Sequence, residues 1–421
     1  MPGHKGKGDI EKYDLTEIEG ADSLFAASGI IARSEALAGE IFGADSYYSA
    51  EGSSLSIRAM LYLATLYTKT LGKEPLVLAG RNAHKSFLSA ASLIGFDIEW
   101  LTSKTGSYLS STVTAGELEE KLSSMKKKPS AIYLTTPDYL GGMIELGAIA
   151  KVCKKEGILL LVDNAHGGYL KFLSPSRHPI DLGADMCADS AHKTLHALTG
   201  AGYLHLSKSL PPFFKSGVKS AMEHFASTSP SYLILASLDG LIERLSGDFS
   251  RELQTKVSKI ASLKREIAAY GYEVLEGEPL KITLSTKSYG YLGTELSSLL
   301  YKRGIVSEFS DPDYLVLMPS VDTTEDELSR LGTVLSEIER RAPITDTPPA
   351  LSLPERRITP REAFLLPYEE ISAEKSSGRI LAAETVACPP AVPIVASGEL
   401  IDKTAVKAFL YYGIKTVKVI K

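Results

Sequence analysis

A fully apolar run, Ile158 to Val162 (ILLLV), ends at Asp163 and constrains the fold more than any other segment of the chain. Shorter apolar runs precede it at residues 76–79, 98–101 and 131–135, and stretches with helical periodicity lie between them. Strands of a parallel sheet that are buried on both faces have such sequences, and a helical crossover connects each strand to the next. The pattern therefore predicts an α/β fold with a mostly parallel, doubly wound sheet.

The chain has 421 residues, which is enough for more than one domain. Residues 230–271 are largely helical, and residues 273–340 mix short strands with helices, including a helix expected over 324–341. Pro348 and Pro349 exclude a helix in the proline-rich stretch that follows. We expect an N-terminal arm (1–20), a large domain (21–250), a smaller α+β domain (251–342), a linker (343–354) and a short C-terminal module (355–421).

Composition excludes several classes of protein. A net charge of −5 argues against nucleic acid as a main partner. The three cysteines (Cys153, Cys187 and Cys388) are too far apart for a disulfide framework or a C-x-x-C metal site, which fits a reducing cytoplasm and predicts no metal. The sequence has no apolar run of about 18 residues and no apolar segment near its start, so we expect neither a membrane span nor a signal peptide.

Two polar features stand where an α/β sheet binds ligands. Gly52-Ser53-Ser54 precedes a helix, whose free N–H groups and hydroxyls suit an anion such as phosphate; a plain helix cap is the alternative. Asp163 follows the apolar run at the carboxyl end of a predicted strand. Its carboxylate could hold a protonated ring nitrogen of a ligand, although a capping or loop aspartate is the commoner case.

A lysine and a histidine add to these features. Lys193 lies in the segment Ser190-Ala191-His192-Lys193-Thr194, among small and polar neighbours that are unusual around a surface lysine. A desolvated lysine amine can form a Schiff base with an aldehyde cofactor. His84 follows another strand and could stack on a cofactor ring, or be a loop histidine. An anion site, then Asp163, then Lys193 about 30 residues later is the order expected of a pyridoxal phosphate enzyme.

Several motifs, in order, resemble the Orn/Lys/Arg decarboxylase family. These are prokaryotic pyridoxal phosphate enzymes of fold type I, in the aspartate aminotransferase superfamily. The similar segments are PGHKG (2–6), DLTEIEGADSLFAASGII (14–31), RNAHKS (81–86), VDNAHGGYL (162–170), DSAHKTLHALTGAGYLH (189–205), STSPSYLILASLD (227–239) and GRILAAETVACPPAVPIVASGEL (378–400). They span essentially the whole chain, so the resemblance rests on no single motif.

The resemblance implies a role for each site residue. Lys193 would be the Schiff-base lysine, Asp163 would pair with the pyridine nitrogen, and His84 would stack on the ring. Ala165 would pack under the ring, and His166 would lie close to cofactor and substrate carboxylate. The phosphate would be held by Ser53, Ser54, Ser190 and His192. Fold type I sites lie at a dimer interface, so a homodimer or larger homo-oligomer is expected, with Ser227, Thr228 and Ser229 supplied to the partner's site.

The chain departs from the family's pattern at a few positions. Asn164 stands where the family's D-E-A-H-G motif has glutamate. In the phosphate loop, Glu51 precedes Gly52, and Leu55 follows the two serines, where relatives carry asparagine or glycine. The PGHKG signature begins at residue 2, whereas relatives have a short helix before it.

The function implied is decarboxylation of arginine, lysine or ornithine to the corresponding amine in the cytoplasm, most simply in polyamine biosynthesis. Glu399 and Asp138 are candidates for binding the distal cation of the substrate, although we expect each of them more readily as a surface carboxylate. Two alternatives stay open. One is another fold type I reaction, such as aminotransfer or a lyase reaction, in which Arg303 or Arg330 could hold the substrate carboxylate. The other is a non-catalytic protein that binds the cofactor.

Overall fold

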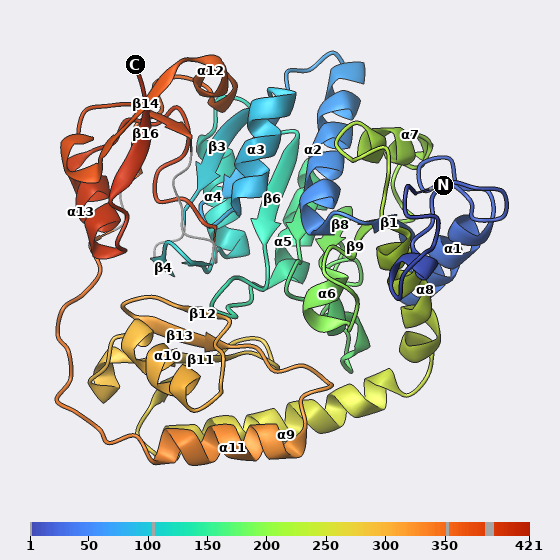
Figure 1. The fold of residues 1–421 in the computed structure, drawn as a ribbon. Coiled ribbons are helices and arrows are strands. Elements are labelled where there is room, and N and C mark those ends of the chain that lie inside the picture. The colour runs from blue at the N-terminus through green and yellow to red at the C-terminus, as the bar shows by residue number, and fades with distance from the viewer. Residues whose placement is uncertain (1, 103–105, 351–352, 384–390) are drawn as a thin grey trace.

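The computed structural model describes residues 2–102, 106–350, 353–383 and 391–421. A seven-stranded sheet in the order β1-β9-β8-β7-β6-β2-β3 forms its centre (Figure 1). Only β9 runs antiparallel to its neighbours, so the predicted mostly parallel sheet is confirmed. The strands are β1 (Asp45–Ser49), β2 (Leu76–Gly80), β3 (Asp97–Leu101), β6 (Ala131–Thr135), β7 (Leu159–Asp163), β8 (Met186–Asp189) and β9 (Gly202–Leu206).

Helices cover both faces of this sheet, which explains why β7 is apolar at successive positions. Leu161 packs in the cluster formed with α2 (Gly52–Thr70), α3 (Lys85–Ile94) and α7 (Pro212–Glu223). Leu160 and Val162 point the other way, toward α4 (Ala115–Ser124) and α5 (Leu146–Glu156). Because successive side chains of a strand alternate between faces, a strand covered on both sides needs an apolar residue at each position. A small ribbon, β4 (Gly106–Ser107) and β5 (Ser110–Ser111), lies in the connection before α4.

A four-stranded antiparallel sheet forms a separate layer, seen at the bottom of Figure 1. Its order is β10-β11-β13-β12, and its helices share one hydrophobic cluster with α1 (Ile30–Phe42) and α8 (Tyr232–Ser246). The strands are β10 (Glu273–Val274), β11 (Ile282–Ser285), β12 (Phe309–Ser310) and β13 (Tyr314–Leu317), and the helices are α9 (Phe249–Ala269), α10 (Gly293–Lys302) and α11 (Glu325–Ser336).

The last of these helices is shorter than the expected 324–341. It begins after the capping box of Thr324 and Glu327 and ends at Ser336. Beyond it, the hydroxyls of Tyr289 and Tyr291 donate hydrogen bonds to the carbonyls of Ile338 and Glu339. These tertiary contacts replace the helical hydrogen bonds that the helical periodicity of residues 324–341 predicts.

A three-stranded sheet, in the order β14-β16-β15, carries the C-terminal part of the chain. It packs beside α3 and the edge strand β3 through α12, and Glu399 binds both Arg81 and Trp100 there. Its elements are α12 (Pro360–Leu365), β14 (Tyr368–Ser372), β15 (Leu381–Ala383), α13 (Lys403–Tyr411) and β16 (Thr416–Ile420). The three sheets fall in separate stretches of sequence, and the division into five segments given above stays a prediction.

Two further expectations concern cysteines and membranes. Cys153 and Cys187 are buried free thiols, and Cys388 lies outside the described residues. Within the described part of the chain, none of the helices is both long and apolar enough to cross a membrane.

Candidate active site

Asp163 is the last residue of β7 and lies at the carboxyl edge of the sheet, where open α/β folds bind their ligands. Its side chain is 2% exposed and accepts hydrogen bonds from the Ala165 N–H at 3.1 Å and from the Tyr133 hydroxyl at 3.1 Å. Burial raises the pKa of this carboxyl, against the lowering effects of the Ala165 N–H, Lys193 and Tyr133. A cationic group beside Asp163 would offset the cost of burying its charge.

Lys193 lies in the one-turn helix α6 (Ala191–Thr194), directly after β8, so its backbone is held at the same edge of the sheet. Its Nζ is 2.9 Å from Nε2 of His166, which follows β7. Burial, together with Lys281 and Lys193, holds the pKa of His166 well below its usual range. The structure therefore brings an amine and a neutral imidazole together beside Asp163.

His84 caps the N-terminus of α3 and approaches the same edge. Its Nδ1 accepts the Ser86 N–H at 3.2 Å. Burial, with the nearby charge of Lys85, lowers the pKa of His84 to about 4. The imidazole is therefore neutral near pH 7, as a group that stacks on an aromatic ring would be.

The predicted phosphate loop is also assembled here. Gly52 has φ +65°, a conformation that favours glycine, and its N–H donates to the Gly200 carbonyl at 2.6 Å. The Ser190 hydroxyl donates to that of Ser53 at 2.9 Å, although the two serines are 137 residues apart. Ser53 and Ser54 lie in the first turn of α2, a 19-residue helix whose N-terminus favours an anion.

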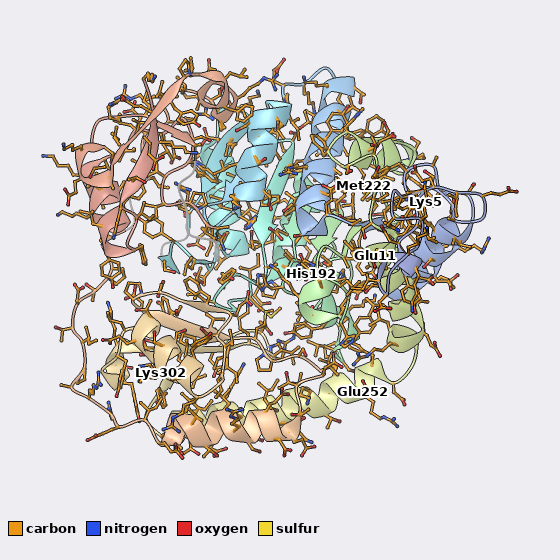
Figure 2. The ribbon with its side chains drawn as sticks, in the orientation of Figure 1. Lys5, Glu11, His192, Met222, Glu252 and Lys302 are labelled. Atoms are coloured by element: carbon orange, nitrogen blue, oxygen red, sulfur yellow. The ribbon has the colours of Figure 1, made fainter. Side chains whose placement is uncertain are left out.

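His192 completes this end of the site. It lies close to the middle of the molecule, as Figure 2 shows, and its Nδ1 donates to the Ala201 carbonyl at 2.9 Å. The ring also lies next to Gly52, where a Cβ would stand 3.6 Å from its Cε1. Ser53 therefore meets Ser190 and His192, which come from a distant part of the sequence, at the N-terminus of α2.

Behind Asp163 lies a buried polar network around Asp189, the last residue of β8. Asp189 Oδ1 accepts from the Asn164 amide at 2.8 Å, and Oδ2 lies 2.9 Å from Nε2 of His178 and 3.4 Å from Nε2 of His205. Although burial opposes it, the two histidines hold the pKa of Asp189 well below its usual range. Asn164 stands where the family's motif has glutamate. Its amide thus contacts an ionised carboxylate. His205 in turn contacts the Ser46 hydroxyl through Nδ1 at 2.8 Å.

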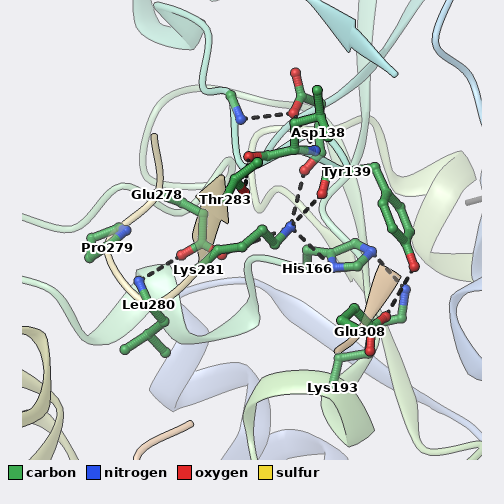
Figure 3. A network of polar contacts seen from close by, with 12 residues as sticks. Asp138, Tyr139, His166, Lys193, Glu278, Pro279, Leu280, Lys281, Thr283 and Glu308 are labelled. Carbon is green, nitrogen blue, oxygen red and sulfur yellow. Dashed lines mark hydrogen bonds and ion pairs between the residues drawn. The ribbon is translucent and has the colours of Figure 1, made fainter. Parts of the chain in front are cut away.

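Sequence reasoning missed three residues of the site, which Figure 3 shows around His166. Lys281, just before β11, is 2% exposed, and its Nζ lies 3.5 Å from His166 Nδ1. Tyr139 packs edge-on against the His166 ring and donates its hydroxyl to Glu308 at 3.1 Å. Lys281 is the first residue of the run KITLS, whose other residues are apolar or carry hydroxyls. This charge next to a buried strand is the one feature of the sequence that could have indicated a role for Lys281.

The two carboxylates considered for the distal cation are not surface groups, since Glu399 and Asp138 are each 1% exposed. Glu399 is engaged by Arg81 and Trp100 at the C-terminal sheet. Asp138 Oδ1 accepts the N–H groups of Leu140 and Gly142, so it stabilises its own loop. The expectation that either carboxylate lies on the surface is wrong, because both are buried inside the fold.

The arginines considered for an aminotransferase are exposed, Arg303 at the end of α10 and Arg330 within α11. Arg303 pairs with Glu337 at 2.8 Å, and Arg330 donates to the Arg303 carbonyl. Ser227 to Ser229, expected at the partner's site, are exposed, and the Ser227 N–H donates to Glu51 of the same chain at 2.6 Å. Glu51, which precedes the phosphate loop, therefore fixes this exposed segment.

The chemistry of these side chains fits pyridoxal phosphate. A buried carboxylate would face the ring nitrogen, an amine would face the aldehyde, and hydroxyls at a helix N-terminus would face the phosphate. The raised pKa of Asp163 also indicates a carboxylate whose burial a cationic partner would offset.

Comparisons with known proteins agree with this fit. The family described as Orn/Lys/Arg decarboxylase, major domain, matches residues 7–276. An arginine decarboxylase of Bacillus subtilis (strain 168) is 30% identical over 443 residues, which cover 96% of this chain and 88% of that protein. The solved structure of the constitutive lysine decarboxylase of E. coli has a TM-score of 0.80 at 19% identity, covering 100% of this chain and 79% of that one.

A further solved structure, described as SPT with PLP, has a TM-score of 0.57 at 16% identity and covers 72% of this chain and 74% of that one. At these low identities the structural likenesses establish the fold, which is that of fold type I pyridoxal phosphate (PLP) enzymes. The family match covers well over half of the chain. The protein therefore belongs to the Orn/Lys/Arg decarboxylase family and is a pyridoxal phosphate-dependent decarboxylase.

Proposed function

We propose that this enzyme binds pyridoxal phosphate at Lys193 and decarboxylates a basic amino acid, with arginine favoured over lysine and ornithine. The observation that carries the proposal is the 2.9 Å contact of Lys193 Nζ with His166 Nε2 beside the buried Asp163. Arginine is favoured because relatives that align over 96% of this chain are named arginine decarboxylases. By family resemblance we further propose a cytoplasmic homodimer or larger homo-oligomer that acts in polyamine biosynthesis.

Each residue of the site has a defined task in this proposal. Ser53, Ser54, Ser190 and His192 would hold the phosphate, His84 would cover one face of the ring, and Ala165 would pack under it. The cofactor supplies an aldehyde that reacts with amines and an electron-accepting ring. Asp163 would keep a proton on the ring nitrogen, because its buried carboxylate is stabilised by a cation.

Lys193 would carry the proton, and His166 would position the lysine. The substrate ammonium loses a proton when it binds the cofactor, so Lys193 would take up that proton and deliver it to the substrate Cα once CO2 has left. His166 Nε2, 2.9 Å from Lys193 Nζ, would hold the lysine in place. The catalytic groups would therefore be Lys193, Asp163, His84 and His166, as the family resemblance implies. Burial of Asp163 and His166 keeps water from this exchange.

Glu308 supplies a carboxylate for the distal cation of the substrate. It precedes β12 on the smaller domain, is partly buried, and accepts the Tyr139 hydroxyl at 3.1 Å. Figure 3 shows it on the Lys193 side of His166. A guanidinium or ammonium group would form charge-assisted hydrogen bonds there.

The test is to load the purified protein with pyridoxal phosphate and to measure CO2 and amine release from arginine, lysine and ornithine separately. We expect release from one basic amino acid, most readily arginine. The Lys193→Ala variant should lose activity by about 1,000-fold or more, because it removes the reacting amine. Cofactor binding without release from any of the three would contradict a basic amino acid substrate and would favour another reaction.

Glu308→Gln is the matched variant for substrate choice. It keeps an acceptor for Tyr139 but loses the charge, so we expect a KM for arginine about tenfold higher with little change in kcat. Glu337→Gln, in an exposed ion pair on the same domain, is the control and should leave both constants unchanged. An unchanged KM in Glu308→Gln would exclude Glu308 as the cation site.

A further inference from the structure

We infer that Lys281 is a positioning residue that fixes the tautomer of His166 and thereby holds the Lys193 amine uncharged. Lys281 Nζ lies within hydrogen-bond distance of three acceptors: the Asp138 carbonyl at 3.2 Å, the Tyr139 carbonyl at 3.3 Å and His166 Nδ1 at 3.5 Å. An ammonium group has three N–H donors and no lone pair, so three acceptors satisfy it completely. The inference rests on the proposed function, in which Lys193 is the cofactor lysine.

The two nitrogens of the His166 ring then have opposite roles. A neutral imidazole carries one proton, and the hydrogen bond at one nitrogen decides which nitrogen holds it. Because Nδ1 accepts from the Lys281 ammonium, the proton lies on Nε2. Nε2 therefore donates to Lys193 Nζ across 2.9 Å. To accept that hydrogen bond, the Lys193 amine must present a lone pair, which is the uncharged form that attacks an aldehyde.

Charges on several elements act on this relay. Glu278 Oε1 lies 4.0 Å from Lys281 Nζ and supports its charge, and Glu278 is itself held by the Tyr169 hydroxyl and by the Leu280 N–H at 2.8 Å. Burial lowers the pKa of Lys281, and carboxylates around it oppose this. The other charged or titratable groups that act on the three residues are Asp138, Glu308, His84, His192 and Asp163.

Lys281 also connects two layers of the fold. It lies just before β11 of the four-stranded sheet, whereas its three acceptors belong to the loops after β6 and β7 of the seven-stranded sheet (Figure 3). The position of the smaller domain therefore sets the charge state of Lys193. A shift of this domain that withdraws Lys281 would release His166 to the other tautomer.

The tautomer can be measured without mutation. In protein labelled with 15N-histidine and free of cofactor, the 15N chemical shifts of His166 distinguish a protonated from an unprotonated ring nitrogen; the His166→Gln spectrum assigns the resonance. We expect a protonated Nε2 and a bare Nδ1 near pH 7. A proton on Nδ1 would overturn the proposal, and this measurement holds even if a variant at position 281 fails to fold.

Lys281→Met removes the ammonium but keeps an unbranched side chain. We expect the pH at which cofactor capture is half-maximal, followed by the absorbance of the protein–cofactor complex, to rise by about one unit. At pH 7 capture then slows by about tenfold, since one unit is a tenfold change. The His166 15N signals should also shift toward the Nδ1-protonated form.

Lys264→Met is the control, because Lys264 also binds the loop of Lys281, at the carbonyls of Glu278 and Pro279, without contact to His166. It should leave both readouts unchanged. Equal pH profiles in wild type and Lys281→Met, or an equal shift in both variants, would contradict a specific role of Lys281. Failure of the wild-type protein to capture the cofactor at any pH would instead contradict the proposed function.

Discussion

Asn164 shows how one side chain can adapt a buried site. Its amide donates to Asp189 at 2.8 Å, and both residues are 0% exposed. Asp189 is held ionised by His178 and His205. The glutamate found in the family's motif would here place a second carboxylate against Asp189, so the amide matches this chain's own network.

Asn164→Glu should therefore destabilise the fold relative to Asn164→Gln, because glutamine has the length of glutamate but carries no charge. We expect a difference of about 2–4 kcal/mol in the free energy of unfolding at pH 7, from urea denaturation. The introduced carboxyl would have a higher pKa in the folded than in the unfolded state. The folded state then binds more protons, so the difference should shrink as the pH falls toward 5. Equal stability of the two variants at pH 7 would refute this account.

The residues of the site could be found from the sequence only in part. Asp163, His84, His166 and Lys193 stand beside strand ends, which the apolar runs reveal. Lys281 could not be found in this way, because its partner carbonyls are more than 140 residues earlier in the chain. Its role depends on how two sheets pack, and local periodicity does not record that.

At the scale of elements, short polar caps set where helices begin. Thr114, Thr324 and Thr359 form capping boxes with the glutamate three residues later, a pattern visible in the sequence. The beginnings of these helices are therefore predictable. The end of α11 is not, because the hydroxyls of Tyr289 and Tyr291 bind the carbonyls beyond it.

His84 caps α3 with its imidazole, and the burial of this ring makes stability depend on pH. The pKa of His84 is about 4 in the folded protein, below its usual value of 6.5. The unfolded state therefore binds more protons between these values, so stability falls as the pH drops from about 6.5 to 4. We expect this residue to account for about 2 kcal/mol of the loss between pH 7 and pH 5.

The variant that checks this is His84→Asn, which retains a good capping side chain but cannot titrate. Unfolding followed at pH 7 and pH 5 should show a smaller loss for the variant than for wild type. An identical loss in both proteins would show that other groups cause the pH dependence.

At the scale of the whole molecule, a buried ion pair joins the C-terminal sheet to the central one. Glu399 accepts from Arg81 at 3.0 Å, from the Trp100 indole at 2.9 Å and from the Ala396 N–H at 2.7 Å. The Arg81 guanidinium also lies 4.7 Å from the centre of the Trp100 ring. The three-stranded sheet is thus fixed by a few desolvated polar contacts, and loss of one partner leaves the other charge buried.

Glu399→Gln should loosen this attachment. Hydrogen exchange of the β15 and β16 amides should become faster, with a loss of about 2–4 kcal/mol in local stability. Glu369→Gln is the control, because it removes an exposed pair with Arg379 in the same sheet and should cost about 0–1 kcal/mol. If the two variants exchange alike, the buried pair does not hold the module in place.

The most direct test of the account is to trap the cofactor on the chain. The protein is mixed with pyridoxal phosphate, reduced with borohydride and digested, and the labelled lysine is identified by mass spectrometry. We expect a phosphopyridoxyl group on Lys193, and no label in Lys193→Ala. A label on Lys281, or on any other lysine with Lys193 unmodified, would contradict it.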